Sequence, residues 1–169
     1  MSEARRAPSA ATRLNWRGVT LDARTATALE WAEKKAGAGV RIIPVQGSYR
    51  PASALSGSTH TKGGAVDIRS RTLTVAQRVR LVHALKDAGF AAWYRRPGSG
   101  FAPHIHAILA GGGADGTAPV GGVSLSSGAA WQVRAFDKGR DGLTRNQGDP
   151  TYRPSRRRWS WRLNGPVRR

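Results

Sequence analysis

The order of apolar and polar positions along the chain predicts four short strands. Residues 65–68 and 101–109 alternate between the two kinds of side chain, as strands with one face on a core do. Residues 40–46 form a third strand, and Pro44 favours an edge position for it because proline cannot donate a ladder hydrogen bond. Residues 90–94 are predicted to run antiparallel to residues 101–109.

A longer apolar period predicts helices over residues 25–37 and 74–89, each ending at a glycine. The predicted apolar stripe of the second helix consists of Val75, Val79, Val82 and Leu85. Residues 129–136 suit a third, short helix. The expected fold is therefore α+β: a small antiparallel sheet that carries the functional site, with helices packed on the other face.

The chain divides into three parts by composition. Residues 1–13, rich in alanine and arginine, are expected to form a flexible basic arm, and residues 14–136 one folded domain. Residues 137–169 form a basic extension in which arginines are interleaved with Trp159 and Trp161. Such a tail suits contact with phosphate or glycan, and it equally suits packing of its tryptophans onto the domain.

The net charge of the chain indicates which classes of molecule it attracts. The chain has 28 lysines and arginines against 10 acidic residues, a net charge of +18. Such a field attracts polyanions: nucleic acid, anionic membranes, or the anionic polymers of a bacterial wall. No apolar run approaches the roughly 20 residues of a transmembrane segment, and residues 1–15 lack the apolar region of a signal peptide.

Candidate chemistry is concentrated in two places. His60 precedes Asp67 by seven positions, with two glycines between them that permit a tight turn. His104 and His106 share one face of the 101–109 strand. The chain has no cysteine, so a sulfur-ligated metal or a disulfide is excluded. We predict His60, Asp67 and His106 as zinc ligands, with His104 beside them as base or transition-state stabiliser. The fourth histidine, His83, is expected to be structural or exposed on its helix.

These residues resemble a known family of zinc peptidases. The pattern Ser-x-His-x2-Gly-x-Ala-x-Asp over residues 58–67, followed by His-x-His, is similar to the group that includes lysostaphin, the D-Ala-D-Ala metallopeptidases and Sonic hedgehog. Within it, the D-Ala-D-Ala carboxypeptidase and endolysin branch is most similar. Gly-Ser-Tyr-Arg at residues 47–50 resembles that branch's Gly-Tyr-Arg segment. The resemblance spans roughly residues 40–109.

The resemblance implies a hedgehog or DD-peptidase-like fold, a Zn²⁺ cofactor and bacterial peptidoglycan as substrate. It also implies that Arg50, at the end of a strand facing the site, steadies the scissile carbonyl. Ser58, Tyr49 and Trp93 are the residues predicted to contact the substrate.

One position departs from the family pattern. Many members of the branch have a general-base Glu or Asp three residues before the last histidine ligand, where this chain has Pro103. His104 is the expected substitute, because an imidazole titrates near neutral pH, and Asp115 is the second candidate.

The sequence thus predicts a zinc-dependent peptidoglycan hydrolase, a DD-carboxypeptidase or endopeptidase of endolysin type, and leaves the cleaved bond open. It would reach the wall after release from the cytoplasm or on a phage particle, and its basic tail would contact anionic wall polymers. The alternative is a non-catalytic module that binds nucleic acid or another polyanion. A third reading keeps the metal and loses catalysis, as in hedgehog-type relatives.

Overall fold

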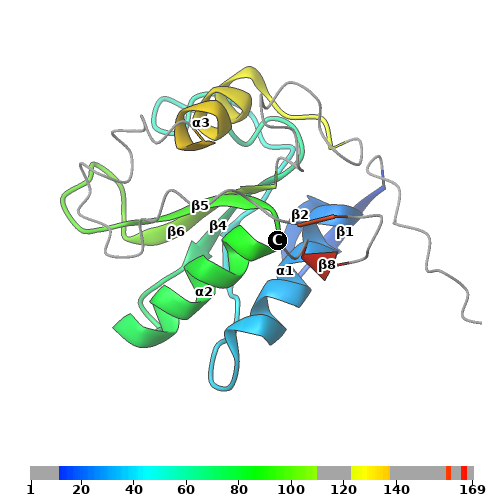
Figure 1. Cartoon of the computed structure of the whole chain (residues 1–169). Helices are drawn as coiled ribbons and strands as arrows, with labels where there is room; N and C mark the ends of the chain where they lie inside the picture. The colour runs from blue at the N-terminus through cyan, green and yellow to red at the C-terminus, as the bar shows by residue number, and fades with distance from the viewer. Residues whose placement is uncertain (1–11, 110–122, 138–158, 161–164, 167–169) are drawn as a thin grey trace, which may run out of the picture.

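A four-stranded antiparallel sheet forms the centre of the molecule, in the strand order β3-β4-β6-β5 (Figure 1). The computed structural model describes residues 12–109, 123–137, 159–160 and 165–166. The sheet consists of β3 (Pro44–Gln46), β4 (Ala65–Arg69), β5 (Phe90–Arg95) and β6 (His104–Leu109). Two small antiparallel pairs accompany it: β1 (Arg13–Trp16) with β2 (Val19–Asp22), and β7 (Trp159–Ser160) with β8 (Gly165–Pro166).

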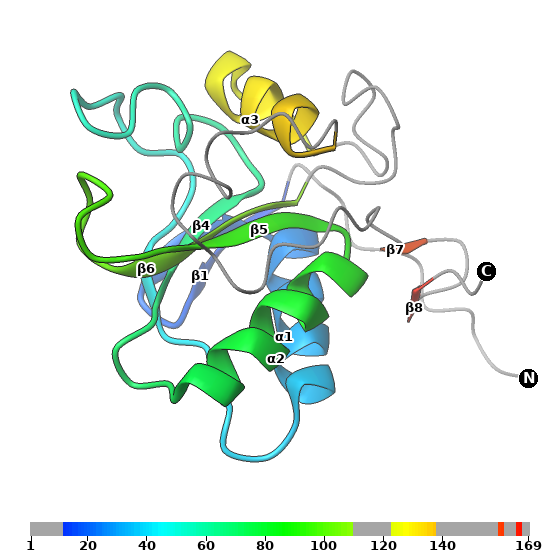
Figure 2. The same ribbon diagram turned by 60° about the vertical axis from the view of Figure 1, so that its left-hand side comes forward.

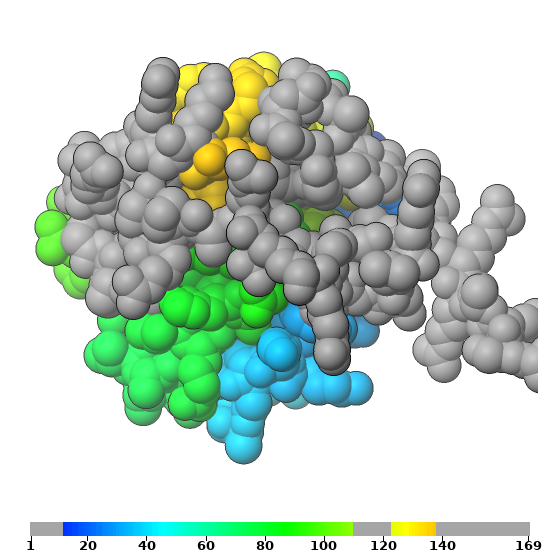
Figure 3. Space-filling view, in the orientation of Figure 1, coloured from blue at the N-terminus to red at the C-terminus, as the bar shows by residue number. Residues whose placement is uncertain are grey.

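Three helices complete the described fold: α1 (Ala23–Ala36), α2 (Val75–Asp87) and α3 (Ser127–Asp137). The predicted α+β class is confirmed. Helices α1 and α2 lie side by side on one face of the sheet, and α3 lies on the other (Figures 1 and 2). In the space-filling view α1 and α2 together form one continuous surface (Figure 3). None of the helices in the described ranges is long and apolar enough to cross a membrane.

The two faces of the sheet differ in character because side chains alternate along each strand. The face toward α1 and α2 is wholly apolar and belongs to the main core, with Val66 and Ile68 from β4 and Ile105 and Ala107 from β6. The opposite face is apolar only at one end, where Ile108 and its neighbours pack against α3. Helix α3 covers this end, and the remaining positions of that face are polar.

Helix α2 begins with reciprocal hydrogen bonds between Thr74 and Gln77, which satisfy two backbone N–H groups of its first turn. The predicted helix is confirmed, but its predicted apolar stripe is wrong at Val75, which is 61% exposed. The buried positions of α2 begin at Leu81, so its first turn projects beyond the core.

Strand β3 is shorter than the predicted strand over residues 40–46. It is an edge strand, as Pro44 indicated. Ile42 is fully buried but outside the strand, because its N–H donates to Glu33 Oε2 at 2.6 Å and its carbonyl accepts from Arg17 at 2.7 Å. Side chains therefore replace the ladder hydrogen bonds at this position.

Candidate metal centre

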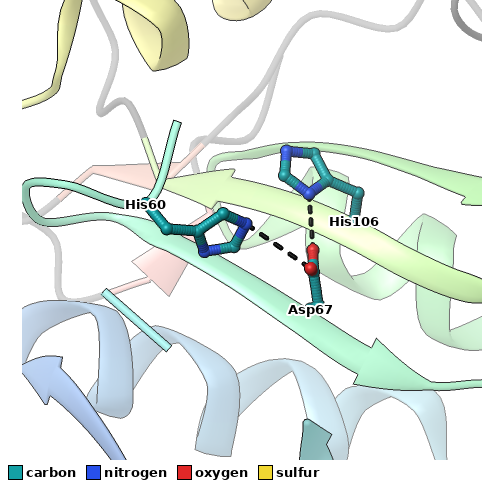
Figure 4. A group of neighbouring side chains, drawn as sticks. All are labelled: His60, Asp67 and His106. Carbon is teal, nitrogen blue, oxygen red and sulfur yellow. Dashed lines mark hydrogen bonds and ion pairs between the residues drawn. The ribbon is translucent and has the colours of Figure 1, made fainter. Parts of the chain in front are cut away.

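Three side chains predicted as metal ligands meet on the polar part of the sheet: His60, Asp67 and His106. Asp67 in β4 lies directly opposite His106 in β6, and His60 reaches them from the loop before β4 (Figure 4). Asp67 Oδ1 is 2.6 Å from His106 Nδ1, and Asp67 Oδ2 is 3.5 Å from His60 Nε2. One ligand atom from each residue lies within 4.8 Å of the others. This buried group can hold a metal ion.

The loop that carries His60 is held to the preceding segment by its backbone. The N–H of Arg50 donates to the His60 carbonyl at 2.9 Å, and the N–H of Tyr49 donates to Lys62 at 3.3 Å. Gly64 then turns the chain into β4 with a φ of +87°, in the left-handed region that favours glycine. These contacts fix His60 beside Asp67 although six residues separate them along the chain.

The second ring nitrogen of each ligand histidine is also held. His60 Nδ1 lies 2.8 Å from the carbonyl oxygen of Gly47, which can only accept, so Nδ1 carries the proton and Nε2 is left with its lone pair toward the site. His106 Nε2 lies 3.0 Å from Oε1 of Gln132 in α3. Histidines that bind metals usually donate their other N–H to such an oxygen. The surroundings of both rings therefore fit a metal bound at His60 Nε2 and His106 Nδ1.

The protonation states of His106 and Asp67 also suit the binding of a metal ion. Burial lowers the pKa of His106 to about 4, so the imidazole is neutral near pH 7. Burial alone would raise the pKa of Asp67, but the contacts with His106, His104 and His60 outweigh it and hold that pKa well below its ordinary value. Neutral imidazole and ionised carboxylate are the forms that bind metal ions.

His104 lies beside this group, and its Nε2 atom makes no hydrogen bond to any described residue. Its Nδ1 donates to the carbonyl of Ala102 at 2.6 Å, which leaves Nε2 as the acceptor of the neutral ring. Nε2 is buried and lies 3.4 Å from Asp67 Oδ1. An imidazole held through Nδ1 next to a metal-binding group is suited to exchange a proton at Nε2.

The group opens into a cleft of about 800 Å³. Its lining includes His60, Asp67, His104, His106 and Gln132. The lining also includes three arginines, Arg69, Arg71 and Arg95, and apolar side chains such as those of Val45, Leu55 and Phe101. The volume of the cleft lies within the range of about 300–1,000 Å³ that is typical of ligand pockets.

Arg50, predicted to face the site, and Tyr49, predicted to contact the substrate, do not line this cleft; both line a separate, smaller hollow. The backbone of Tyr49 has a φ of +58°, which turns the chain after β3, and the Arg50 side chain is exposed. The Arg50 backbone therefore contacts His60, whereas the Arg50 side chain does not line the cleft that contains the metal-binding group.

Ser58 and Trp93, predicted to contact the substrate, do not line the cleft; they contact α3 and the residues of the metal-binding group instead. Ser58 Oγ accepts a hydrogen bond from the N–H of Gly128 at 3.1 Å and so attaches the start of α3 to the His60 loop. Trp93 is fully buried, with its ring centre 4.9 Å from that of His106 and 6.0 Å from that of Phe136. Asp115 lies outside the described residues.

Several residues of the cleft were not predicted, among them Gln132 and Arg95. Gln132 belongs to a predicted helix that nothing in the sequence connected to the histidines. Arg95 is two residues after Trp93 and lies opposite His104 in the neighbouring strand. Its position along the strand could therefore have indicated that it lies on the same face as the histidines.

Comparison of the chain with protein-family models, with curated proteins and with solved structures finds no match.

Proposed function

We propose that the protein is a zinc-dependent hydrolase that cleaves a peptide bond in the stem peptides or cross-links of bacterial peptidoglycan. The observation that supports this most is the buried group of His60, Asp67 and His106 at the wall of an open cleft, with His104 beside it. A purely structural metal site is closed and usually four-coordinate, whereas catalytic sites use three protein ligands and remain open.

Zinc is the metal we propose because two imidazoles and one carboxylate match its catalytic sites. His60 Nε2, His106 Nδ1 and a carboxylate oxygen of Asp67 would hold it. When bound, zinc polarises a carbonyl and makes water a nucleophile near neutral pH.

The chain's own residues contribute orientation and proton transfer. Gly47 and Gln132 fix the two ligand rings through their second nitrogens. His104 is proposed to accept a proton at Nε2 and to return it to the leaving amine, since its Nδ1–H is held by Ala102. The cleft walls would hold an extended peptide across these groups.

Peptidoglycan is proposed from the motif resemblance and from the net charge of +18, which suits an anionic wall. The basic extension over residues 137–169 would add contacts to wall polymers, and the enzyme would act after release from the cytoplasm or from a phage particle. A hedgehog or DD-peptidase-like arrangement and the choice between carboxypeptidase and endopeptidase belong to the same proposal.

A polyanion-binding module without catalysis is the second candidate, favoured by the same net charge. Duplex binding that weakens steeply with salt, in a chain that binds no zinc, would support it over the hydrolase.

The test is digestion of purified peptidoglycan by the wild type, by His106→Ala and by His83→Ala. His83 is exposed on α2, outside the cleft, so its variant controls for loss of a histidine. We expect the wild type and His83→Ala to release peptide fragments and His106→Ala to release none. Mass spectrometry of the fragments identifies the bond. Equal digestion by His106→Ala would refute the proposal.

A further inference from the structure

The polar face of the sheet carries a cationic row next to the metal-binding row. Across β4, β6 and β5, Arg69 pairs with His104, and His104 pairs with Arg95. The row two residues along these strands is that of Asp67, His106 and Trp93. Because alternate residues share a face, the two rows point to the same side. Arg69 and Arg95 therefore line the same cleft as the metal-binding group.

Arg95 is only 5% exposed, whereas arginine side chains are rarely buried unless they have a charged partner. Its guanidinium lies 4.0 Å from the centre of the Phe101 ring and 5.8 Å from that of Trp93. Its Nε is buried and has no hydrogen-bond partner among the described residues. A buried guanidinium with an unused N–H is costly unless a ligand pairs with it.

The cleft itself supplies no free anion for these arginines. Among the described residues that line it, Asp67 is the sole carboxylate, against Arg69, Arg71 and Arg95. The Asp67 oxygens are already within 3.5 Å of ring nitrogens of three histidines. The described lining of the cleft therefore has an excess of positive charge that an anionic ligand would compensate.

We propose that Arg95 and Arg69 bind a carboxylate of the substrate that is not part of the cleaved bond, and thereby select acidic over amidated peptides. The inference rests on the proposed function for the identity of the substrate as a wall peptide. The carboxylate would lie at the end of the cleft marked by His104, and the apolar lining at Val45 and Leu55 would take other parts of the peptide.

The geometry favours a carboxylate in a peptide over the phosphates of a nucleic acid. A guanidinium stacked on Phe101 presents its N–H groups along its edge, where they can pair with two oxygens of a carboxylate or of a phosphate, so the burial of Arg95 decides between the two ligands. Arg95 lies within a cleft and is only 5% exposed, so a single carboxylate group of a peptide can reach it more easily than the continuous phosphate backbone of a nucleic acid, which follows a positively charged groove.

The test is calorimetric titration of a synthetic stem peptide that contains the L-Ala-D-Glu and D-Ala-D-Ala bonds, made once with free carboxyl groups and once with carboxamides. The full chain is used with zinc removed by a chelator, so that no peptide is consumed, and at one fixed ionic strength. We expect the acidic form to bind about 10- to 100-fold more tightly, as for a charge-assisted contact. Arg95→Gln and Arg69→Gln should each reduce this preference, Arg95→Gln to nearly none.

Arg96→Gln is the matched control, because Arg96 is the chain neighbour of Arg95 but is exposed and outside the cleft lining of the described residues. It should keep the full preference. Arg95→Lys, which keeps the charge and loses the flat edge, should keep part of it. Thermal unfolding identifies any variant that does not fold, and the half-buried Arg69 then carries the test.

Equal binding of both peptides by the wild type, binding of neither, or an unchanged preference in folded Arg95→Gln and Arg69→Gln would each overturn the inference. Failure of the proposed function is recognised separately. A zinc-loaded wild type that prefers the acidic peptide but never cleaves it would refute the hydrolase and leave the carboxylate site standing.

Discussion

Asp22 Oδ2 accepts a hydrogen bond from the N–H of Gly64 at 3.1 Å, across 42 positions of the chain. The same carboxylate begins α1, accepting from the N–H of Thr25 at 2.8 Å and from its hydroxyl at 2.8 Å. Asp22 is fully buried. The start of α1 and the turn that places His60 beside Asp67 are therefore held by one side chain.

Replacement of Asp22 by alanine should destabilise the fold by about 2–4 kcal/mol, because it removes a helix cap and leaves the buried N–H of Gly64 without an acceptor. Asp22→Asn keeps one acceptor oxygen and should cost less. Urea unfolding measures both free energies. An Asp22→Ala chain as stable as the wild type would show that this link does not hold the turn.

Gly64→Ala should be more destabilising than Gly98→Ala, although the two glycines have nearly the same φ, +87° and +84°. Alanine in this region costs about 1–2 kcal/mol at either site. At Gly64 an added Cβ would also lie 2.7 Å from Leu125 Cδ2 and 2.8 Å from the Leu109 carbonyl, whereas at Gly98 it meets nothing within 4 Å. We expect a further cost of about 1–3 kcal/mol at Gly64. Equal unfolding free energies for the two variants would contradict the close approach.

Gln132→Ala should weaken zinc binding about 10- to 100-fold without abolishing it, since loss of a residue that orients a ligand histidine typically has this effect. Competition against a chromophoric chelator measures the affinity. Trp131→Ala is the control, because Trp131 is the chain neighbour and is 57% exposed. Unchanged affinity in Gln132→Ala would mean that the 3.0 Å contact with His106 does not position the ring.

The sequence predicted the four strands of the central sheet and the metal-binding group for the same reason: both depend on local alternation. It did not predict the β1–β2 pair, which begins at Arg13. Side chains two apart on a strand share a face whatever the rest of the fold does, so Asp67, His104 and His106 could be placed before any tertiary contact was known. The two glycines after His60 added the turn. Val66 and Ile68 went to the core by the same rule, as the structure confirms.

What the sequence could not predict depends on contacts between distant segments. Arg50 was placed toward the site by motif register, but its side chain is exposed and does not line the cleft, although its N–H donates to the His60 carbonyl. Gln132 enters the site because α3 packs on the Trp93 side of the sheet, which no local pattern indicates. Ile42, which the sequence predicted to lie in a strand, is not part of β3 because its N–H donates a hydrogen bond to Glu33, nine residues earlier.

The Glu33 carboxylate should make part of the fold's stability dependent on acid pH. Hydrogen bonds from Arg17 lower the pKa of Glu33 below its ordinary 4.5. Since the folded pKa is the lower one, the ionised group stabilises the fold above about pH 4.5, and this contribution is lost as the pH falls through the folded pKa. The difference in unfolding free energy between wild type and Glu33→Gln should be constant near neutral pH and narrow in acid. A difference that does not change with pH would exclude this role; the partial exposure of the pair keeps the expected size small.

The number of zinc ions bound per chain tests most directly whether Asp67, His60 and His106 hold one zinc ion. The measurement is elemental analysis after equilibrium dialysis against limiting zinc, for the wild type, Asp67→Asn and Asp87→Asn. Asp87→Asn is the control: it is the same substitution at the end of α2, and Asp87 is not among the described residues that line the cleft. We predict one zinc per chain in the wild type and in Asp87→Asn, and much less than one in a folded Asp67→Asn chain. Equal zinc in all three, or none in the wild type, would contradict the account.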